Sequence, residues 1–380
     1  MMTTKLYYLD AYIKEFDAEV VSWEEKNGLY DVVLDRTAFF PEEGGQSSDG
    51  GNISGIKVLS VYEEGSVVHH IVSELPNDKH VHCELDFDER FEKMQCHTAE
   101  HILCGIIHRL FGLDNVGFHL GEDEVTFDIS APLTRDELDE VERLANEAVF
   151  ACLPVDTFFP SGEELPTLEY RSKLELTENV RIVKIGDVDS CACCAPHVKN
   201  TGEIGLIKIL DFMKHRGGLR INMCAGRRAL RDYSEKYGNV KKISAMLSVP
   251  QHETADALSA YMNDVKELKY QLKLSREELC AALADAVPKT DGNYVRLLPD
   301  FSMDDLRAFA NSAKSRIGGM LVLLSGEEGN YKYIIASESV DLTVELKEIK
   351  SALAGGGGGK SGMVQGSFLE SYDRIKEYFI

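Results

Sequence analysis

The sequence predicts an α+β protein built from several domains. At 380 residues the chain is long enough for two or three domains, each with its own hydrophobic core. Alternating, β-branched segments dominate its beginning, apolar residues at helical spacing dominate its middle, and both patterns occur at its end. We therefore expect four parts, with boundaries at residues 1–92, 93–226, 227–290 and 291–380.

The first part is expected to form a small antiparallel β-barrel. Asn-Gly, Gly-Gly and Pro-Asn-Asp turn signals separate its strand-like segments. These segments are Ala18–Glu25, Leu29–Arg36, Ile56–Tyr62, Val67–Val72 and His80–Asp86.

The second part is expected to be an α+β core. Apolar residues at helical spacing predict one helix from Glu92 to about Leu110, and a second follows Pro132 and Thr134. Strand-like stretches occupy residues 125–129, 180–185 and 205–210.

The third part, residues 227–290, is almost wholly helical in pattern and is broken once, at Pro250. After the break, apolar residues recur in alternating steps of three and four, as in a short coiled coil or helical hairpin; they are Leu258, Tyr261, Val265, Leu268, Leu272, Ser275, Leu279 and Ala282. This face packs either on its own chain or on a second copy in a homodimer. The fourth part, residues 291–380, is expected to be a small α/β domain.

Composition excludes several classes of protein. No run of 18 or more apolar residues could span a bilayer, and the N-terminus has no signal-peptide pattern, so the cytoplasm is the expected compartment. Nine cysteines in a large chain favour free thiols or metal binding over a disulfide framework. A formal charge of -23 argues against non-specific binding of nucleic acid, although a local basic groove is compatible with it.

Two pairs of residues have the spacing of metal ligands. His97 and His101 lie four apart, so a helix presents both imidazoles on one face. Cys193 and His197 repeat that spacing, and thiolate with imidazole is the ligand set that zinc favours. Cys191 and Cys194 are competing ligands. Four protein ligands are typical of a structural zinc, whereas catalysis needs an open or expandable position.

Several ordered blocks resemble the editing domain of alanyl-tRNA synthetase and the freestanding AlaX-type alanyl-tRNA editing proteins of the long form. The blocks are T-A-F-F-P-E-E-G-G-Q (37–46), R-F-E-K-M-Q-C-H-T-A-E-H (90–101), V-G-F-H-L-G (116–121), C-C-A-P-H (193–197) and R-I-N-M-C-A-G-R-R (220–228). The usual zinc loop of the family reads C-G-G-T-H, so the ligands match here while the three residues between them differ.

The resemblance implies a trans-editing hydrolase. Its substrate would be tRNA(Ala) wrongly charged with serine or glycine, its cofactor Zn²⁺, and the acceptor end of the tRNA its partner. No aminoacylation domain precedes the barrel, and no DHH phosphoesterase signature is found, so ester hydrolysis without ATP is expected. The open alternatives are a non-catalytic tRNA-binding protein with a structural zinc and a threonine-type editing domain.

The resemblance also assigns roles to residues outside the ligand set. Thr37 is the candidate partner for the serine hydroxyl, because a site built to bind a hydroxyl can reject alanine strongly. Gln46 would line the same wall, and Arg90 would contact the tRNA end or lie in solvent at the start of the zinc helix. Glu100 and His119 are further pocket candidates.

A glycine run near the C-terminus, A-G-G-G-G-G-K-S-G from Ala354 to Gly362, is the most unusual stretch of the chain. A phosphate loop should follow a buried strand, but an amphipathic helical segment precedes this run, so no nucleotide cofactor is expected. The run is predicted to be a glycine-rich loop that meets tRNA through backbone amides and a lysine; the residues are Gly355, Gly356, Gly357, Gly358, Gly359 and Lys360. A flexible linker is the alternative.

Overall fold

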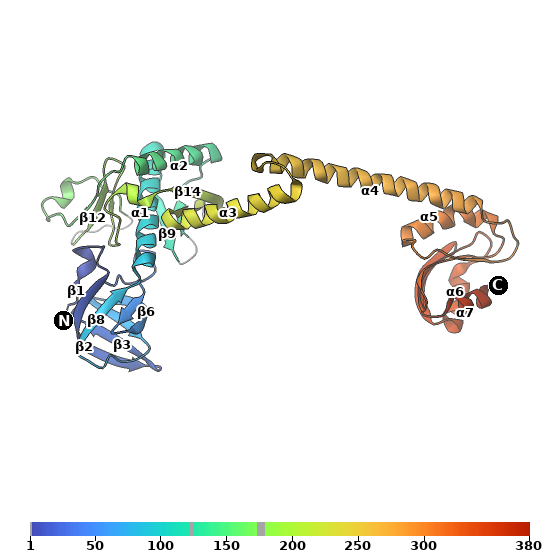
Figure 1. Ribbon diagram of the computed structural model, residues 1–380, viewed down its shortest axis with the longest axis horizontal. Helices are drawn as coiled ribbons and strands as arrows, with labels where there is room; N and C mark the ends of the chain where they lie inside the picture. The colour runs from blue at the N-terminus through green and yellow to red at the C-terminus, as the bar shows by residue number, and fades with distance from the viewer. Residues whose placement is uncertain (1, 122–124, 173–178) are drawn as a thin grey trace. The chain divides into compact units, whose positions relative to one another are not determined.

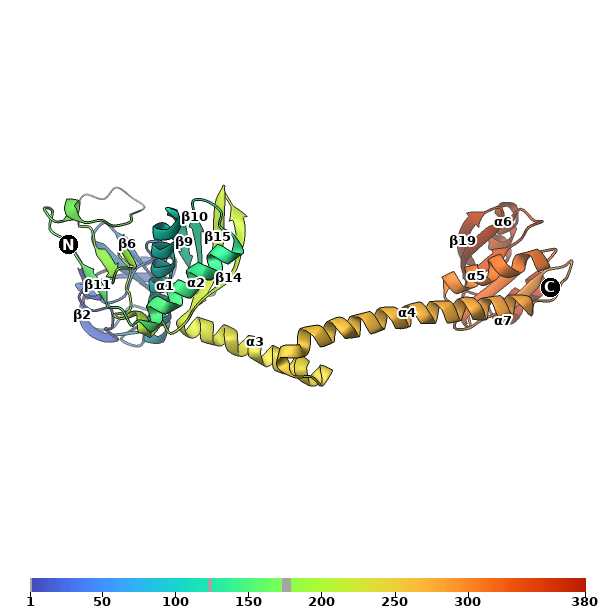
Figure 2. The ribbon, with the colours of Figure 1, turned by 90° about the horizontal axis from the view of Figure 1, so that it is seen from above.

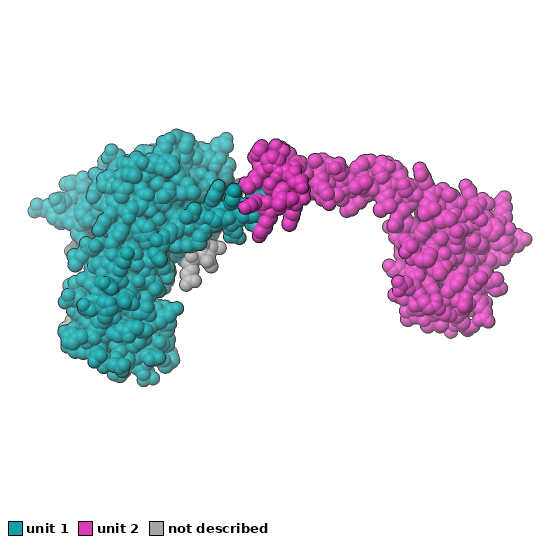
Figure 3. Space-filling view, in the orientation of Figure 1, with its two compact units in different colours: residues 1–240 teal, residues 241–380 magenta. Residues whose placement is uncertain are grey.

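The structure is a computed structural model that describes residues 2–121, 125–172 and 179–380. The chain divides into two compact units, residues 1–240 and 241–380, which Figure 3 distinguishes by colour. Among the described residues no helix is both long and apolar enough to cross a membrane. The α+β class predicted from the sequence is confirmed.

The N-terminal unit begins with a closed antiparallel barrel. Its strands follow the order β2-β3-β7-β6-β5-β8, and every strand is hydrogen-bonded to two neighbours. Alternate apolar side chains fill its interior, as the two-residue period of a strand requires. The strands are β2 (Glu15–Lys26), β3 (Leu29–Leu34), β5 (Gly51–Ile53), β6 (Ile56–Glu64), β7 (Val67–Val72) and β8 (His80–Leu85). Outside it, β1 (Thr4–Lys5) pairs in parallel with β4 (Arg36–Thr37).

Helix α1 (Phe87–Phe111) lies between two sheets of the same unit, and both ribbon views show this (Figures 1 and 2). One sheet has the order β14-β15-β10-β9 and the other β11-β12-β13. Their strands are β9 (Asn115–Leu120), β10 (Val125–Ile129), β11 (Val155–Phe158), β12 (Ile182–Ile185), β13 (Asp189–Ala192), β14 (Ile207–His215) and β15 (Gly218–Ala225). Because α1 is covered on several sides, its polar side chains are buried together with its apolar ones.

Local signals explain where the helices of this unit begin and end. Helix α1 ends at Gly112, whose φ of +65° is the left-handed C-cap conformation that glycine adopts without strain. Helix α2 (Arg135–Phe150) starts with a capping box formed by Thr134 and Glu137. It packs against α1 and β14 and closes the core.

Two long helices follow β15. Helix α3 (Gly226–Leu247) ends shortly before Pro250, and α4 (Thr254–Asp285) starts after it, as the sequence pattern predicts. Five apolar residues of the predicted seam on α4 are exposed, namely Leu258, Tyr261, Leu268, Leu272 and Leu279. The described part of the chain therefore leaves this face uncovered.

The C-terminal unit contains a five-stranded mixed sheet with the order β16-β17-β18-β20-β19. The end of α4 and α5 (Met303–Ala313) contribute to the core on one face, and α6 (Leu342–Ala352) and α7 (Tyr372–Phe379) to the core on the other. Leu321 and Leu323 face the first core, while Val322 and Leu324 face the second. The strands are β16 (Tyr294–Leu297), β17 (Leu321–Glu327), β18 (Asn330–Ala336), β19 (Gly355–Lys360) and β20 (Met363–Phe368).

The glycine run is a strand, which corrects the prediction of a loop. It forms β19, the edge strand, in an antiparallel ladder with β20. A Cβ on Gly357 would lie 2.1 Å from the Tyr333 hydroxyl, whereas a Cβ on Gly358 would meet nothing within 4 Å. Alternate glycines thus allow the sheet to close over a buried tyrosine, and a linker is excluded.

Candidate metal centre

The four predicted ligands lie together in the core of the N-terminal unit. His97 and His101 are one turn apart on α1, and Cys193 and His197 belong to the loop after β13. Their ligand atoms all lie within 4.8 Å of one another. The Cys193 Sγ is 3.4 Å from His197 Nε2 and 3.6 Å from His97 Nε2. All four side chains, two from α1 and two from the loop, therefore face a common centre.

Each histidine of this cluster is oriented by a hydrogen bond from its other nitrogen. His97 Nδ1 donates to Gln46 Oε1 at 2.8 Å, and His101 Nδ1 donates to Asp189 Oδ2 at 3.1 Å. His197 Nδ1 is 3.0 Å from Thr98 Oγ1, whose own proton goes to a backbone carbonyl. All three Nε2 atoms are left facing the centre, which is the arrangement that partners of metal-binding histidines produce.

Burial and charge set the protonation of the ligands. Burial alone raises the pKa of the Cys193 thiol, but the imidazoles around it, His97 first, bring that pKa well below its usual range. Burial lowers the pKa of His197 to about 3. For His101 burial also acts to lower the pKa, but the groups beside it, Cys191 first, raise it well above the ordinary value. A thiolate and a neutral imidazole are the forms that bind a metal.

The donor set fits zinc. Imidazole nitrogens and a thiolate are ligand types that zinc binds, and four of them match its tetrahedral coordination. Cys194 is a poorer candidate, because burial raises the pKa of its thiol and Glu43 beside it does the same. A second potential ligand group, which shares His101, consists of His101, Asp189 and Cys191. In that group Asp189 is already occupied by Arg171, which donates to both carboxylate oxygens at 2.7 and 2.9 Å.

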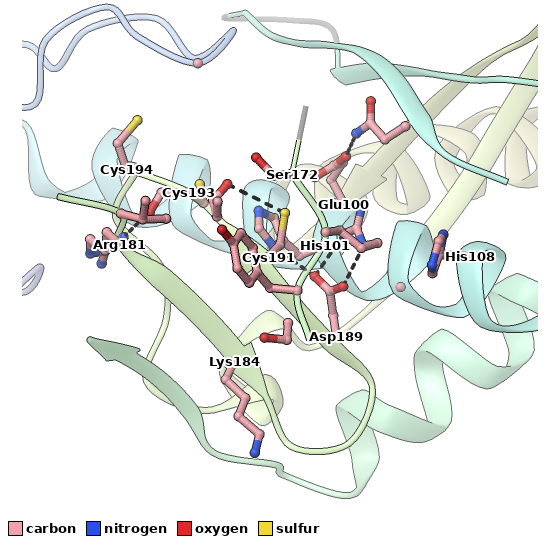
Figure 4. Close-up of a pocket in the computed structure, with 18 of the residues that line it drawn as sticks. Glu100, His101, His108, Ser172, Arg181, Lys184, Asp189, Cys191, Cys193 and Cys194 are labelled. Atoms are coloured by element: carbon pink, nitrogen blue, oxygen red, sulfur yellow. Dashed lines mark hydrogen bonds and ion pairs between the residues drawn. The ribbon is translucent and has the colours of Figure 1, made fainter. Parts of the chain in front are cut away.

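A cavity of about 1320 Å³ opens beside the cluster (Figure 4). His97, His101 and Cys193 line it, together with the carboxylates of Glu100 and Asp189. The close-up shows His101, Asp189 and Cys191 near one another, with Arg181 and Cys194 farther along the same wall. The cluster is thus accessible to a molecule that enters the cavity.

Comparison with known proteins agrees with this architecture. Residues 180–226 match the domain described as the threonyl and alanyl tRNA synthetase second additional domain, and residues 291–379 match the DHHA1 domain. The alanyl-tRNA editing protein AlaX-L of Pyrococcus horikoshii is 30% identical, over 96% of this chain and 94% of its own length. The chain belongs to the family of alanyl-tRNA editing proteins.

Other relatives are also similar over nearly the whole length of this chain. The alanyl-tRNA editing protein Aarsd1 of Danio rerio is 30% identical over 94% of this chain and 92% of its own length. The alanine–tRNA ligase of Thermococcus kodakarensis is 34% identical over 99% of this chain, which spans 43% of that ligase. The similarity to the freestanding members therefore extends over nearly their whole length.

Thr37 does not line the cavity. Thr37 is fully buried in β4, and its hydroxyl lies 2.9 Å from His70 Nε2 and accepts from the Phe39 amide at 3.1 Å. His70 Nδ1 donates to a backbone carbonyl, and burial lowers the His70 pKa to about 4, so the ring is neutral and accepts the Thr37 proton. In this arrangement the single proton of the hydroxyl and one of its two lone pairs are already used within the fold, away from the cavity.

Arg90 does not lie in solvent, so that predicted placement is wrong, and it is not among the residues that line the cavity. Its side chain is fully buried and makes an ion pair with Asp49. It also donates to the carbonyls of Ala38 at 2.7 Å and Ala11 at 3.2 Å. Arg90 therefore fastens the start of α1 to the barrel, where a buried, paired guanidinium replaces its hydration with fixed partners.

The three remaining candidates lie in different places: one is buried, one lines the cavity and one is at the surface. Gln46 is buried behind His97, and its Nε2 has no hydrogen-bond partner among the described residues. Glu100 lines the cavity and accepts from Asn115 Nδ2 and from the Cys104 thiol. His119 is exposed and does not line it.

Two residues with a clear part in the geometry were not predicted from the sequence. Asp189 and Thr98 orient His101 and His197, and both are buried. Thr98 directly follows His97 on α1, and Asp189 stands four residues before Cys193. A search for a carboxylate or hydroxyl near each ligand pair, prompted by the usual partners of metal-bound histidine, would have found them.

Proposed function

We propose that this protein hydrolyses the aminoacyl ester of tRNA(Ala) wrongly charged with serine or glycine, at a zinc ion held by His97, His101, Cys193 and His197. The observation that carries the proposal is the inward orientation of three Nε2 atoms and one thiolate beside a cavity. Membership of the alanyl-tRNA editing family supplies the substrate class.

The chain's own residues would bind and position the ester. An aminoacyl ester is labile, so orientation and modest charge stabilisation suffice for hydrolysis. When bound, zinc would supply Lewis acidity toward an oxygen at the cavity wall. The buried Gln46 Nε2, which has no partner in the described part of the chain, is a preorganised donor behind the cluster. The Glu100 carboxylate, held by Asn115, adds a fixed negative charge on the same wall.

We assign tRNA binding outside the active site to the C-terminal domain, residues 291–380, including Gly355 to Gly359 and Lys360. The support is the exposure of β19 at the sheet edge, where backbone amides and Lys360 are accessible. We also propose that the helical part, residues 227–290, forms a homodimer contact, because five apolar residues of the α4 seam are exposed. The other two parts, residues 1–92 and 93–226, would then be the barrel and the zinc-containing editing core.

The function is tested by incubating the purified protein with seryl-tRNA(Ala) and alanyl-tRNA(Ala). Wild type should release serine rapidly and spare the alanyl ester. A His97→Ala/His101→Ala double variant should lose both the activity and the bound metal, because half of the ligands are gone. His119→Ala is the control, since His119 is exposed and off the cavity. Wild-type protein that holds zinc but spares both seryl-tRNA(Ala) and glycyl-tRNA(Ala) would overturn the proposal.

A further inference from the structure

The cavity is larger than an amino acid requires. Its volume is about 1320 Å³, above the roughly 300–1,000 Å³ of ordinary small-molecule pockets. An aminoacyl group attached to the ribose of a terminal nucleotide brings a base with it. The cavity therefore has room for that base as well as for the ester.

A row of aromatic rings ends at one side of this cavity. Tyr8 and Phe159 line it, with ring centroids 5.4 Å apart and planes at 74°. Behind them Tyr8 contacts the buried Tyr7 at 4.7 Å, and Tyr7 contacts Phe40 at 5.4 Å. Phe159 is 50% exposed, so a face or edge of its ring is available while the rings behind it are fixed.

The same aromatic end is tied to the metal-binding loop. Arg181 donates to the carbonyls of Cys193 at 3.0 Å and Ala195 at 2.8 Å, and its guanidinium lies 5.4 Å from the Tyr8 ring centroid. Tyr8 packs in one cluster with Cys193. Figure 4 shows Arg181 on the wall that carries Cys193 and Cys194. The rings are therefore adjacent to the ligand loop.

Cationic side chains also line the cavity of this acidic protein. Arg109 and Lys184 are exposed and line it, and neither has an ion-pair partner among the residues that the structure describes. Aromatic rings and unpaired cations on the wall of one cavity match the composition of single-stranded nucleic-acid sites, where bases stack and phosphates meet positive charge. An amino acid alone would need neither feature.

We infer that Phe159 and Tyr8 form a stacking platform for the 3′-terminal base of the RNA. The inference rests on the proposed function, because it assigns the base that accompanies the ester. Stacking on aromatic side chains tolerates any base and is sensitive to the removal of either partner. Phe159 is thus a positioning residue for the reaction.

The test measures hydrolysis of a seryl RNA minihelix that ends in CCA, and of the same minihelix with an abasic terminal nucleoside. Phe159→Ala should raise KM for the CCA minihelix about 10-fold, with kcat within about twofold of wild type. Phe159→Trp should restore the wild-type KM. Phe158→Ala is the matched control, because Phe158 is 37% exposed but does not line the cavity.

The abasic substrate separates stacking from a structural effect. The KM of wild type should rise on the abasic substrate by about the factor by which Phe159→Ala raises it on the normal substrate. The KM of Phe159→Ala should be the same for both substrates. Wild-type turnover with an unchanged KM in Phe159→Ala, or an equal loss in Phe158→Ala, overturns the platform alone. Absence of wild-type turnover together with Phe159-dependent binding of the CCA minihelix overturns the function and keeps the platform. Absence of both overturns both.

Discussion

The histidines of the cluster are held by partners from three separate places in the chain. Gln46 lies between β4 and β5, Thr98 is on α1, and Asp189 begins β13. None of these partners is a ligand, yet each fixes which nitrogen faces the centre. Metal affinity should therefore respond to residues outside the ligand set.

Asp189→Asn should lower metal affinity about 10- to 100-fold. The amide keeps the shape of the side chain but removes the negative charge that His101 and Arg171 face. The measurement is competition for zinc against a chelator. Asp187→Asn is the control, because Asp187 lines the same cavity but is exposed; an equal effect of both variants would mean that the field of the cavity, and not orientation of His101, sets the affinity.

Thr37→Val should destabilise the barrel and leave selectivity unchanged. The valine would leave His70 Nε2 and the Phe39 amide unpaired, which costs about 1–3 kcal/mol. Urea unfolding can be followed by the fluorescence of Trp23, the single tryptophan, which lies in β2. Thr157→Val, at an exposed position of β11, should have little effect. Loss of preference for the seryl over the alanyl ester, without loss of stability, would assign Thr37 to the substrate after all.

At the residue scale, the ligand pairs could be predicted from the sequence, but the environment of Arg90 could not. The spacing of four between His97 and His101 and between Cys193 and His197 follows from local geometry, so both pairs were visible in the sequence. Arg90 was not interpretable in the same way. Its partner Asp49 comes from the barrel, and only the packing of α1 on the barrel makes the arginine buried.

At the scale of elements, periodic segments were predictable and context-dependent ones were not. Helix α2 begins at the Thr134 cap, and α3 and α4 are separated at Pro250, as their sequences predict. The glycine run did not look like a strand, because glycine has low strand propensity and no side chain to pack. Its pairing with β20 is a local hairpin, but the close approach of Gly357 to Tyr333 on β18 is a longer-range contact that local sequence does not encode.

Gly357→Ala should destabilise the C-terminal sheet more than Gly358→Ala. The first methyl group would collide with the Tyr333 hydroxyl and the Gln365 carbonyl, whereas the second would enter open space. Overpacking of this kind costs about 1–3 kcal/mol. Amide hydrogen exchange in β18 to β20 is the measurement. Equal protection in the two variants would show that Tyr333 moves aside without cost.

At the scale of the whole molecule, the formal charge of -23 means that an RNA ligand would have to bind at local positive sites. We expect the C-terminal domain to supply part of this affinity. Deletion of residues 291–380 should weaken tRNA binding, measured by filter retention, more than it changes the zinc content of the remaining chain. Full tRNA affinity after the deletion would remove the domain from this role.

The ligand cluster has one more consequence, which concerns folding. Its members and their anchors come from the segment between β4 and β5, from α1 and from the loop after β13, so a bound ion would act as a cross-link between distant segments. Ligand binding to the native state alone adds about 4 kcal/mol of stability when free ligand exceeds Kd by about 1,000-fold. Chelation should then lower the unfolding temperature of residues 1–240 and leave that of residues 241–380 unchanged. The zinc supply of a cell would thereby govern how long the protein survives proteolysis.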